Sequence, residues 1–424
     1  MMLMDATEKL QLLATQMHLE PAEEADPRWV AAQSAAPGST PPGPSQPERP
    51  LAPQSLDTLP CGATASGSPE EKKSALGIYQ AVAPGGKPVA LLKTLLTSAC
   101  ERDCYYCPFR ARRNYRRATF KPEEMARTFI EMHRAGLVQG LFLSSGIAGG
   151  GVRTQDRLIA TAEILRQTYG YRGYLHLKIM PGAEQAQIER VMQLADRVSI
   201  NLEAPNSRRL QQLAPHKQFL DELLRPLQLV EAIRQTQRPD QAWNRRWPSS
   251  VTQFVVGGAG ESDVELLTTT AHLYSEARLA RAYFSAFSPV ADTPLENRPA
   301  ENPLREYRLS QSSFLLRDYG FDLEELPFTP TGNLPLDSDP KLAWAQAHLS
   351  ETPIEVNRAG RQELLRIPGV GPKSADAILA ARRRGILRNL RDLRAIGINV
   401  SRVAPFVLLD GRRPAHQLSL WEQD

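Results

Sequence analysis

The sequence predicts an α/β protein: a parallel, barrel-type domain followed by a smaller all-helical domain. From about residue 85, short apolar runs of β type alternate with longer helical periods, which is typical of parallel strands joined by helices. Beyond about residue 350, short helices joined by glycine hairpins replace that alternation. The chain has 424 residues, of which 42% are hydrophobic, so it is long enough for two or three domains with a sizeable core.

The N-terminal part of the chain carries little of this pattern. Leu10, Leu13 and Met17 suggest a short amphipathic helix within residues 1–25, and residues 26–80, crowded with Pro, Ser, Gly and Ala, read as a disordered linker. No apolar run approaches the ~20 residues needed to span a bilayer, and no secretory leader is recognisable. We therefore expect a cytoplasmic protein that makes no use of a membrane.

Three of the four cysteines lie in one stretch, Cys100-x3-Cys104-x2-Cys107. Thiolates select iron-sulfur clusters, zinc or copper(I), and this spacing lets one loop surround one metal centre. The stretch offers no fourth protein ligand, so one coordination position is left open. Cys61 lies in the linker and is expected to be a free thiol, which excludes a disulfide framework. The alternative is a zinc loop completed by one of three distant ligands: Cys61, His133 or His176.

The run Val89–Leu96 predicts a strand that leads directly into the cysteine loop. In parallel α/β barrels the chemistry sits on loops that leave the carboxyl ends of strands, so this loop stands where a site belongs. Five arginines follow this loop directly. They either form a solvated surface or contact phosphate, and the sequence favours neither interpretation over the other. The five are Arg110, Arg112, Arg113, Arg116 and Arg117.

Later strands carry further polar candidates. We expect strands at 140–146, 173–180, 197–205, 251–256 and 282–287, with helices at 123–135, 155–169, 183–195, 219–236 and 263–278 between them. His176 and Lys178 share one face of their strand. Lys178 either binds an anionic ligand there or forms a structural ion pair. Asn201 and Glu203 stand two residues apart and point the same way, so their amide and carboxylate suit the hydroxyls of a ribose.

The cysteine stretch, with the aromatic Tyr106 before its last cysteine, resembles the cluster loop of the radical S-adenosylmethionine (SAM) enzymes. The resemblance implies that Cys100, Cys104 and Cys107 hold three irons of a [4Fe-4S] cluster and that SAM chelates the fourth. It also implies a partial (β/α)6 radical SAM barrel over residues 85–330. An external electron donor would drive the reductive cleavage of SAM to a 5′-deoxyadenosyl radical.

The resemblance extends to the contacts with SAM. Where the family has a glycine-rich turn near the SAM amino group, this chain has Ser144, Ser145 and Gly146 instead of the strict Gly-Gly-Glu form. Asn201-Leu-Glu203 resembles the Asn-Leu-Asp/Glu of biotin and lipoyl synthases, which holds the ribose. The segment 251–261 resembles the family's Gly-x-Ile-x-Gly-x-x-Glu segment near the adenine. Its matching residues are Val256, Gly258 and Glu261, with Phe254 in place of the first Gly.

The final domain, residues 352–413, follows a connecting segment at 331–351. Its helices at 361–367 and 372–384, joined by a hairpin, resemble a helix-hairpin-helix DNA-binding motif, and residues 395–398 resemble a degenerate second copy. Gly369 and Gly371 free the first helix amides to meet an anion, and Lys373 adds a cation. Thirteen basic and four acidic residues from Arg358 to Arg413 give a basic footprint suited to nucleic acid. A helical module that binds protein, or merely caps the barrel, is the alternative.

The barrel and the C-terminal domain together predict a radical SAM enzyme that acts on DNA. The complete chain resembles radical SAM proteins regarded as DNA modification or repair enzymes. Backbone amides and a lysine position DNA without reading its sequence, so selection falls to the barrel. A radical enzyme that acts on RNA is the second hypothesis. The third is a non-catalytic iron-sulfur protein that binds DNA; Asn201 and Glu203 argue against it, because a passive cluster has no use for a ribose site.

Overall fold

The computed structural model describes residues 4–17, 75–82 and 88–415. Its residues group into two compact units, each assembled from separate stretches of the chain. The first unit comprises Met1–Leu202, Leu213–Thr252 and Ser288–Arg298, and the second comprises Glu203–Gln212, Gln253–Phe287 and Pro299–Asp424. Cys61 and residues 26–74 of the expected linker lie outside the described residues.

The main sheet has seven strands among the described residues, and they follow one another in sequence order. The antiparallel first strand, β1 (Ile78–Val82), was not expected and begins within the stretch interpreted as linker. β2 to β6 then form a parallel ladder, and β7 lies next to β6. Their bounds are β2 Pro88–Leu95, β3 Gly140–Ser144, β4 Tyr174–Lys178, β5 Arg197–Ser199, β6 Ser249–Val256 and β7 Arg281–Ala286. This order confirms the predicted α/β partial barrel.

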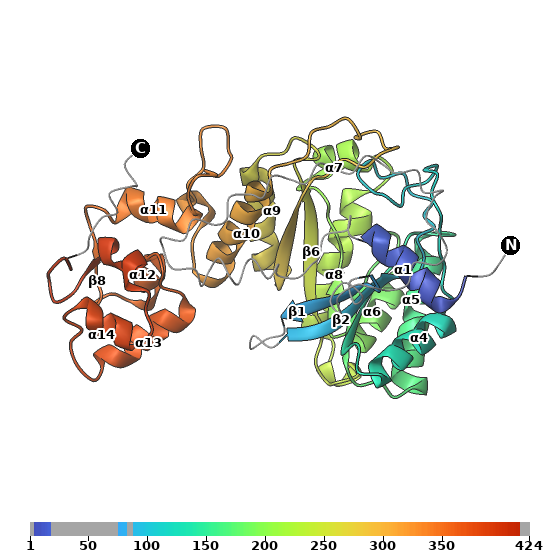
Figure 1. Ribbon diagram of the computed structural model, residues 1–424, viewed down its shortest axis with the longest axis horizontal. Coiled ribbons are helices and arrows are strands. Elements are labelled where there is room, and N and C mark those ends of the chain that lie inside the picture. Colours follow the sequence, from blue (N-terminus) through green and yellow to red (C-terminus); the bar gives the residue numbers. More distant parts are fainter. Residues whose placement is uncertain (1–3, 18–74, 83–87, 416–424) are drawn as a thin grey trace, which may run out of the picture. The chain divides into compact units, whose positions relative to one another are not determined.

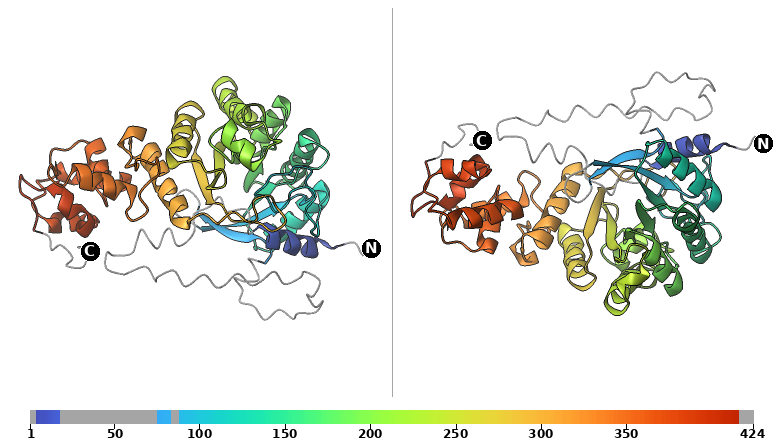
Figure 2. Two further views of the ribbon diagram at one scale, coloured as in Figure 1. Left: turned by 90° about the horizontal axis from the view of Figure 1, so that it is seen from above. Right: turned by 90° about the horizontal axis from the view of Figure 1, so that it is seen from below.

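Helices separate the parallel strands, as the alternation of periods predicted, and those of the first unit follow one another along one side of its strands (Figures 1 and 2). The helices between the strands in both units are α4 Pro122–Arg134, α5 Gly151–Glu163, α6 Gln185–Leu194, α7 Ser207–Leu213, α8 Arg225–Thr236 and α9 Asp263–Glu276, with π-helical turns at Ile164–Thr168 and Phe219–Leu224. The N-terminal α1 (Ala6–Met17) packs near α4, where Lys9 and Glu124 form an ion pair of 2.6 Å. None of the described helices is both long and apolar enough to cross a membrane.

The two faces of the first unit's strands differ in chemistry because successive residues point to opposite sides. Leu141, Leu143, Leu175 and Leu177 are fully buried on one face, which suits packing under helices. The other face carries Phe142, His176 and Lys178, which the register places beside one another on β3 and β4. The polar chemistry of the barrel is therefore confined to the face opposite the leucines.

The end of the chain forms a helical region with its own core. Its elements are α10 Pro303–Asp318, α11 Pro340–His348, α12 Arg361–Arg366, α13 Pro372–Arg382, α14 Leu390–Ala395 and α15 Val400–Val403, together with β8 Ile354–Glu355 and β9 Val407–Leu408. The two short strands pair in parallel, a small departure from the expected all-helical domain. Ala345 of α11 and Leu349, just after that helix, share one apolar core with Leu364, Val370 and Val403. Helix α11 thus packs as part of this domain.

Candidate functional site

The cysteines lie on a long loop that is closed at its neck. Thr97 and Thr119 form an isolated antiparallel bridge, and the Ser98 N–H donates to the Ala118 carbonyl at 3.0 Å. The Ala118 N–H returns a bond of 3.0 Å to the Ser98 hydroxyl. The loop leaves the carboxyl end of β2, so the predicted ligands occupy the expected edge of the sheet.

The three thiols are at least partly buried and lie close enough to influence one another. Cys104 is buried, and Cys100 and Cys107 are half-buried. Burial is the main cause that raises the pKa of the Cys107 thiol well above its ordinary value, and charge on Cys104 and Cys100 raises it further. A Phe109 backbone N–H bond and the Lys217 cation act in the opposite direction. The Ile147 N–H also donates to the Cys100 Sγ at 3.4 Å.

The geometry of the described residues disfavours a single-ion site. No three of their His, Cys, Asp and Glu side chains converge so as to hold one metal ion. A cluster that takes one cysteine per iron needs no such convergence. His133, offered as a zinc ligand, instead bonds the Val138 carbonyl at 2.9 Å and lies 5.0 Å from the Tyr171 ring, and His176 lies 4.6 Å from the Phe142 ring.

The glycine-rich turn after β3 packs directly on the cysteine loop. A Cβ at Gly146 would lie 2.3 Å from the Ala99 carbonyl oxygen, so only glycine fits there. The Glu101 carboxylate accepts the amides of Gly149 and Gly150 at 3.0 and 3.1 Å. Sequence reasoning placed this turn near SAM but missed its second role, which is to fix the loop that carries Cys100. The buried Ser144 and Ser145 lead into the turn.

Most of the arginine run serves the loop itself. Arg117 donates to the carbonyls of Ser98, Arg110 and Arg113, and its guanidinium lies 4.1 Å from the centre of the Tyr115 ring. Arg113 donates to the carbonyls of Pro108 and Ala291, and Arg110 to that of Asp103. Arg113 and Arg117 therefore use several donors to hold backbone, whereas the Nε of Arg110 is buried without a hydrogen-bond partner among the described residues. Contact of the run with phosphate stays a prediction. Arg112 and Arg116 remain exposed.

Three further residues around the cysteines were not predicted: Lys217, Glu222 and His216. Lys217 donates to the Tyr106 hydroxyl at 3.3 Å, and Arg102 pairs with Glu222 at 2.5 Å. His216 bonds the Asp103 carboxylate at 2.8 Å. Their partners Arg102, Asp103 and Tyr106 stand between the cysteines, which was the available signal, but contacts more than 100 residues apart do not follow from local pattern.

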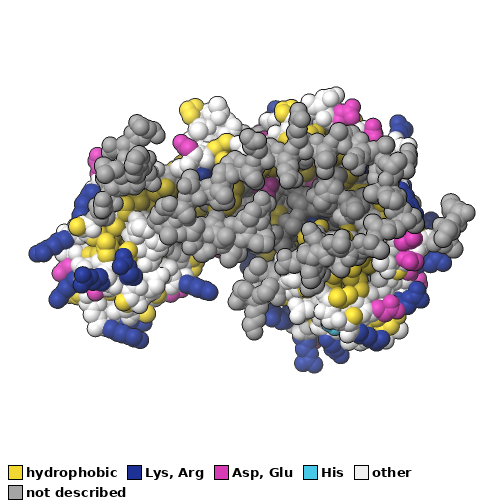
Figure 3. All heavy atoms as spheres, viewed as in Figure 1, with side chains coloured by type: hydrophobic (Ala, Val, Ile, Leu, Met, Phe, Trp, Pro, Cys, Tyr) yellow, Lys and Arg dark blue, Asp and Glu magenta, His cyan; other side chains and the backbone are white. Residues whose placement is uncertain are grey.

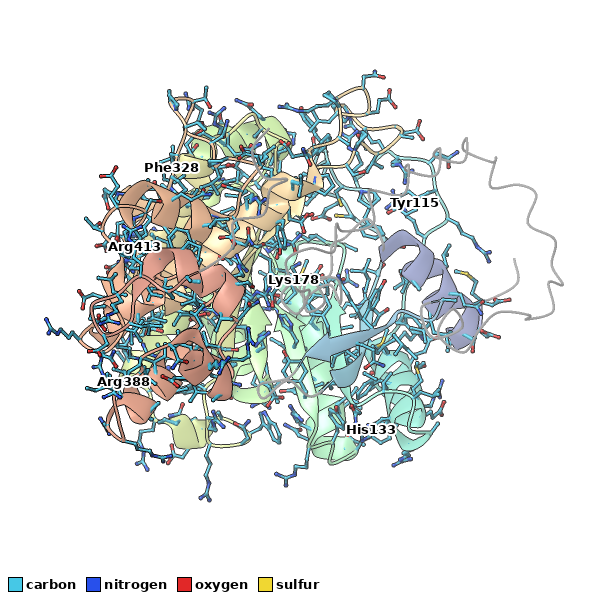
Figure 4. All side chains as sticks on the ribbon, turned by 60° about the vertical axis from the view of Figure 1, so that its left-hand side comes forward. Tyr115, His133, Lys178, Phe328, Arg388 and Arg413 are labelled. Carbon is cyan, nitrogen blue, oxygen red and sulfur yellow. The ribbon has the colours of Figure 1, made fainter. Side chains whose placement is uncertain are left out.

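The polar face of the barrel collects cations around one imidazole. Lys93 and Lys178 lie 5.6 and 5.9 Å from the centre of the Phe142 ring, against which the His176 ring packs edge to face. Burial lowers the pKa of His176 well below its ordinary value, and Arg197, Lys178 and Lys93 lower it further. Figure 4 shows Lys178 on the strands. The face combines positive charge with aromatic surface, which suits an anionic, planar ligand.

Asn201 is the site residue with an unsatisfied atom. Its Oδ1 is buried without a hydrogen-bond partner among the described residues, an arrangement that costs free energy unless a ligand supplies a donor. The expected strand at 197–205 is shorter: β5 ends at Ser199, and Glu203 has a φ of 64°. A left-handed residue breaks the strict alternation, so strand geometry no longer supports the inference that Asn201 and Glu203 point the same way, and their shared role stays a prediction.

The remaining predicted SAM residues lie in the second unit. Glu203 is buried and pairs through its backbone with Gln253 and Val255. Glu261 accepts the amides of Gly257 and Ala259, so its carboxylate closes the turn that contains Gly258. Val256 is fully buried at the end of β6. Phe254 stacks on Phe284 at 5.8 Å, which explains an aromatic where the family has glycine.

The first hairpin of the C-terminal domain presents free amides. Val370 donates its N–H to Ile367 at 3.0 Å, whereas the N–H groups of Gly369, Gly371 and Lys373 have no acceptor among the described residues. Gly369 has a φ of 82°. Lys341 of α11 holds the other side of the hairpin, since its Nζ donates to the Val370 carbonyl at 2.6 Å. The free amides lie just before and within the first turn of α13, and the N-terminus of a helix attracts anions.

A curled α/β sheet whose strand loop presents three cysteines is a scaffold for a metal-dependent enzyme. Comparison with known families refines this class. Residues 94–273 match the model of the radical SAM superfamily, and residues 353–381 match the helix-hairpin-helix motif. No curated protein matches significantly. The chain therefore contains a radical SAM superfamily domain with a C-terminal helix-hairpin-helix motif.

Three solved structures illustrate what the chain is similar to in fold. The FeFe-hydrogenase maturase HydG from Carboxydothermus hydrogenoformans shares 13% identity, with 54% of this chain and 51% of that chain covered and a TM-score of 0.42. Methylornithine synthase (PylB) shares 17%, covering 54% and 62%, with a TM-score of 0.41. Coproporphyrinogen III oxidase (HemN) from Escherichia coli shares 13%, covering 53% and 51%, with a TM-score of 0.33. The chain thus spans about half to three fifths of the length of these proteins.

The family implies a [4Fe-4S] cluster and SAM, and the residues fit both groups. Three cysteine thiols on one loop, of which Cys100 accepts the Ile147 N–H, are the donor set of such a cluster. The orphan Oδ1 of Asn201 offers an acceptor for a hydroxyl or an amine.

Proposed function

We propose that this chain is a radical SAM enzyme that acts on nucleic acid, with DNA as the substrate, in a modification or repair reaction. The observation that carries the proposal is the row of orphan amides at Gly369, Gly371 and Lys373, at the start of a helix in a helix-hairpin-helix motif. Backbone amides at a helix N-terminus bind phosphate without reading bases. The domain would then hold the polymer and leave selection to the barrel.

Within this proposal the residues of the barrel have separate tasks. Cys100, Cys104 and Cys107 would hold the cluster, with Tyr106 packed beside the last of them. Asn201 and Glu203 would hold SAM, together with the turns at Ser144–Gly146 and Val256–Glu261. When bound, the cluster and SAM supply reductive cleavage that generates a 5′-deoxyadenosyl radical able to abstract hydrogen. An external electron donor is required.

The polar face of the sheet supports a nucleotide as the reacting part. A phosphate would suit the cations Lys93, Lys178 and Arg197, and a base would suit the Phe142 ring that lies between two of them. Enzymes that act on a base in a polymer commonly take it out of the stack and read it in a pocket.

The proposal is tested with anaerobically reconstituted, full-length protein. SAM cleavage is followed by 5′-deoxyadenosine formation alone, with duplex DNA, with single-stranded DNA and with RNA. We expect cleavage in all samples and deuterium transfer from labelled DNA into 5′-deoxyadenosine. Transfer from RNA but not DNA would assign RNA as the substrate. Cleavage that no polymer alters, with no transfer from any, would refute action on nucleic acid.

A further inference from the structure

The C-terminal domain contains two structural copies of one motif. Gly369 and Gly397, 28 positions apart, both have positive φ, 82° and 80°. At the same offset Leu365 and Leu393 are fully buried, as are Val370 and Ile398 to within a few per cent. The second copy, judged degenerate from sequence, therefore keeps the backbone and core of the first.

The hairpin amides of the two copies differ. In the first copy, Gly369 and Gly371 keep their N–H groups free among the described residues. In the second, the Gly397 N–H donates to the Arg394 carbonyl at 3.0 Å, and the Ile398 N–H donates to Leu393 at 3.1 Å. Val370, the counterpart of Ile398, also donates its N–H, so the hairpins differ at one amide: among the described residues Gly369 keeps its N–H free and Gly397 does not. The second hairpin therefore has one donor fewer for a phosphate. Its following helix, α15, has only four residues.

The second copy instead carries guanidinium groups at its surface. Its first helix and the loop before it carry exposed arginines where the first copy has Gly360, Glu363 and Arg366. Glu363 caps the Gly360 amide at 2.6 Å, and Arg366 pairs with Glu325 at 2.7 Å, so neither is available for a ligand. We call the exposed set the arginine ridge: Arg383, Arg384, Arg388, Arg391 and Arg394.

The side chains of the ridge have no partners among the described residues. None of the five forms an ion pair or a side-chain hydrogen bond within the part of the chain that the structure describes. Several other arginines of the domain are engaged: Arg361 pairs with Asp376, Arg402 pairs with Asp339, and Arg382 donates to the Ala359 carbonyl. The fold thus leaves the charge of the ridge at the surface, where five arginines fall within twelve consecutive residues.

No carboxylate within the ridge cancels this charge. Asp392 lies on the same helix, but its Oδ2 accepts the amides of Arg388 and Asn389 at 2.7 and 3.2 Å. Figure 4 shows Arg388 extending outward at the edge of the domain, and Figure 3 shows Lys and Arg side chains over the C-terminal helices. Arg391 and Arg394 lie three residues apart on α14, about 4.5 Å along the helix axis, and Arg388 lies just before the helix. That spacing is close to the rise of about 3.4 Å between successive nucleotides of one strand.

We propose that the second copy binds a nucleic-acid backbone through the arginine ridge and not through its hairpin amides. This inference rests on the proposed function and adds a second contact surface to it. A guanidinium presents paired donors that match two phosphate oxygens, and it keeps its charge at any physiological pH. The two copies would thus hold one polymer by different chemistry, amides in the first and arginines in the second. An acidic protein segment is the competing occupant.

The test compares two triple variants of the full-length, reconstituted protein. R388Q/R391Q/R394Q removes three charges from the ridge and keeps side chains that favour helix. R127Q/R172Q/R246Q removes three exposed charges from the first unit and serves as the matched control. Affinity for a labelled DNA duplex is measured at several salt concentrations. We expect the slope of log K against log salt to become shallower by about 2.7 in the ridge variant, at about 0.9 per phosphate contact, and to change little in the control.

The outcomes separate the inference from the function on which it rests. If the ridge variant keeps the wild-type slope while Lys373→Gln lowers it, the ridge assignment is refuted and the hairpin still binds nucleic acid. If the wild type shows no salt-dependent binding to DNA or RNA, the proposed function fails as well. Binding of polyglutamate as tight as that of DNA, lost in the same variant, would assign the ridge to an acidic protein. Unchanged substrate-free SAM cleavage and melting temperature show that the variants fold.

Discussion

Single residues around the cysteine loop act through their contacts as much as through their chemistry. The predicted ligands Cys100, Cys104 and Cys107 came from spacing alone, because thiols at such intervals on one loop have few other uses. The residues that shape the loop could not be found that way. Glu101 and Arg117 are ordinary charged residues in sequence, and only the folded chain brings their partners, Gly149 and Ser98 among them, within hydrogen-bond distance.

The first prediction concerns the thiols. Changing Cys100, Cys104 or Cys107 to Ala should abolish the cluster, because each removes the only protein ligand of one iron. Anaerobically reconstituted wild type should contain about four irons per chain and show the absorption of a [4Fe-4S] cluster. Cys61→Ala is the matched control and should retain full iron content. Stoichiometric zinc in the wild type, or a cluster that survives loss of any one of the three, would contradict the assignment.

The second prediction isolates a steric role. Gly146→Ala should destabilise the loop, because its Cβ would meet the Ala99 carbonyl at 2.3 Å and backbone there cannot yield without moving Cys100. Overpacking of this kind costs about 1–3 kcal/mol. Gly385→Ala, where a Cβ meets nothing within 4 Å, is the control. Iron content after reconstitution and the melting temperature should fall in the first variant alone; equal values in both would show that the loop tolerates the added methyl group.

At the scale of whole elements, the periodic pattern of the sequence predicted the strands and helices but not a strand end that depends on one backbone angle. Apolar runs with helical stretches between them gave the parallel strands, and paired glycines gave the hairpin. The strand expected to run to residue 205 ends at Ser199 because Glu203 takes a left-handed conformation, and periodicity carries no signal of that. Strand β1 was missed because its five residues follow a stretch of linker composition.

The packing of α11 against the hairpin gives a third prediction, which concerns pH. Burial lowers the pKa of Lys341 to about 7 from an ordinary 10.5, and the nearby cations Arg402 and Arg366 lower it further while Asp339 opposes them. Between those two values the unfolded chain binds more protons than the folded one, so stability rises with pH, by at most about 1.4 kcal/mol per pH unit. Below pH 7 Lys341 is charged in the folded and the unfolded chain, so burial of the charge lowers the free energy of unfolding by its full amount.

Denaturant unfolding of the wild type and of Lys341→Met at pH 7, 8 and 9 measures this effect. The variant cannot titrate at that position, so its stability should rise less steeply than that of the wild type over this range. Lys373→Met, at an exposed lysine of the same domain, should leave the wild-type dependence unchanged. Parallel curves for the wild type and Lys341→Met would show that the amine is not held at a lowered pKa against the Val370 carbonyl.

At the scale of the whole molecule, the proposed function divides the work between the barrel and a C-terminal domain that would hold the polymer. Side-chain contacts join the helix-hairpin-helix motif to the elements before it: Arg366 pairs with Glu325 of the 3-10 turn Leu323–Glu325, and Lys341 of α11 donates to the Val370 carbonyl. If the C-terminal domain only retains the polymer, its effect is on local substrate concentration, and the reaction of a bound substrate is the same with or without it.

The last prediction follows from that separation. Combining Lys373→Glu with R388Q/R391Q/R394Q should raise the KM for DNA by at least tenfold, since each lost phosphate contact weakens binding in the salt-dependent manner of a polyanion. kcat at saturating DNA and the rate of SAM cleavage without DNA should stay near their wild-type values, because neither change touches the barrel. Raising the salt concentration should narrow the difference in KM, as screening removes the same contacts from the wild type. Initial rates of 5′-deoxyadenosine formation over a range of DNA and salt concentrations decide it. A fall in kcat with KM unchanged would mean that the domain takes part in the reacting complex itself, and retention of the polymer would no longer describe its role.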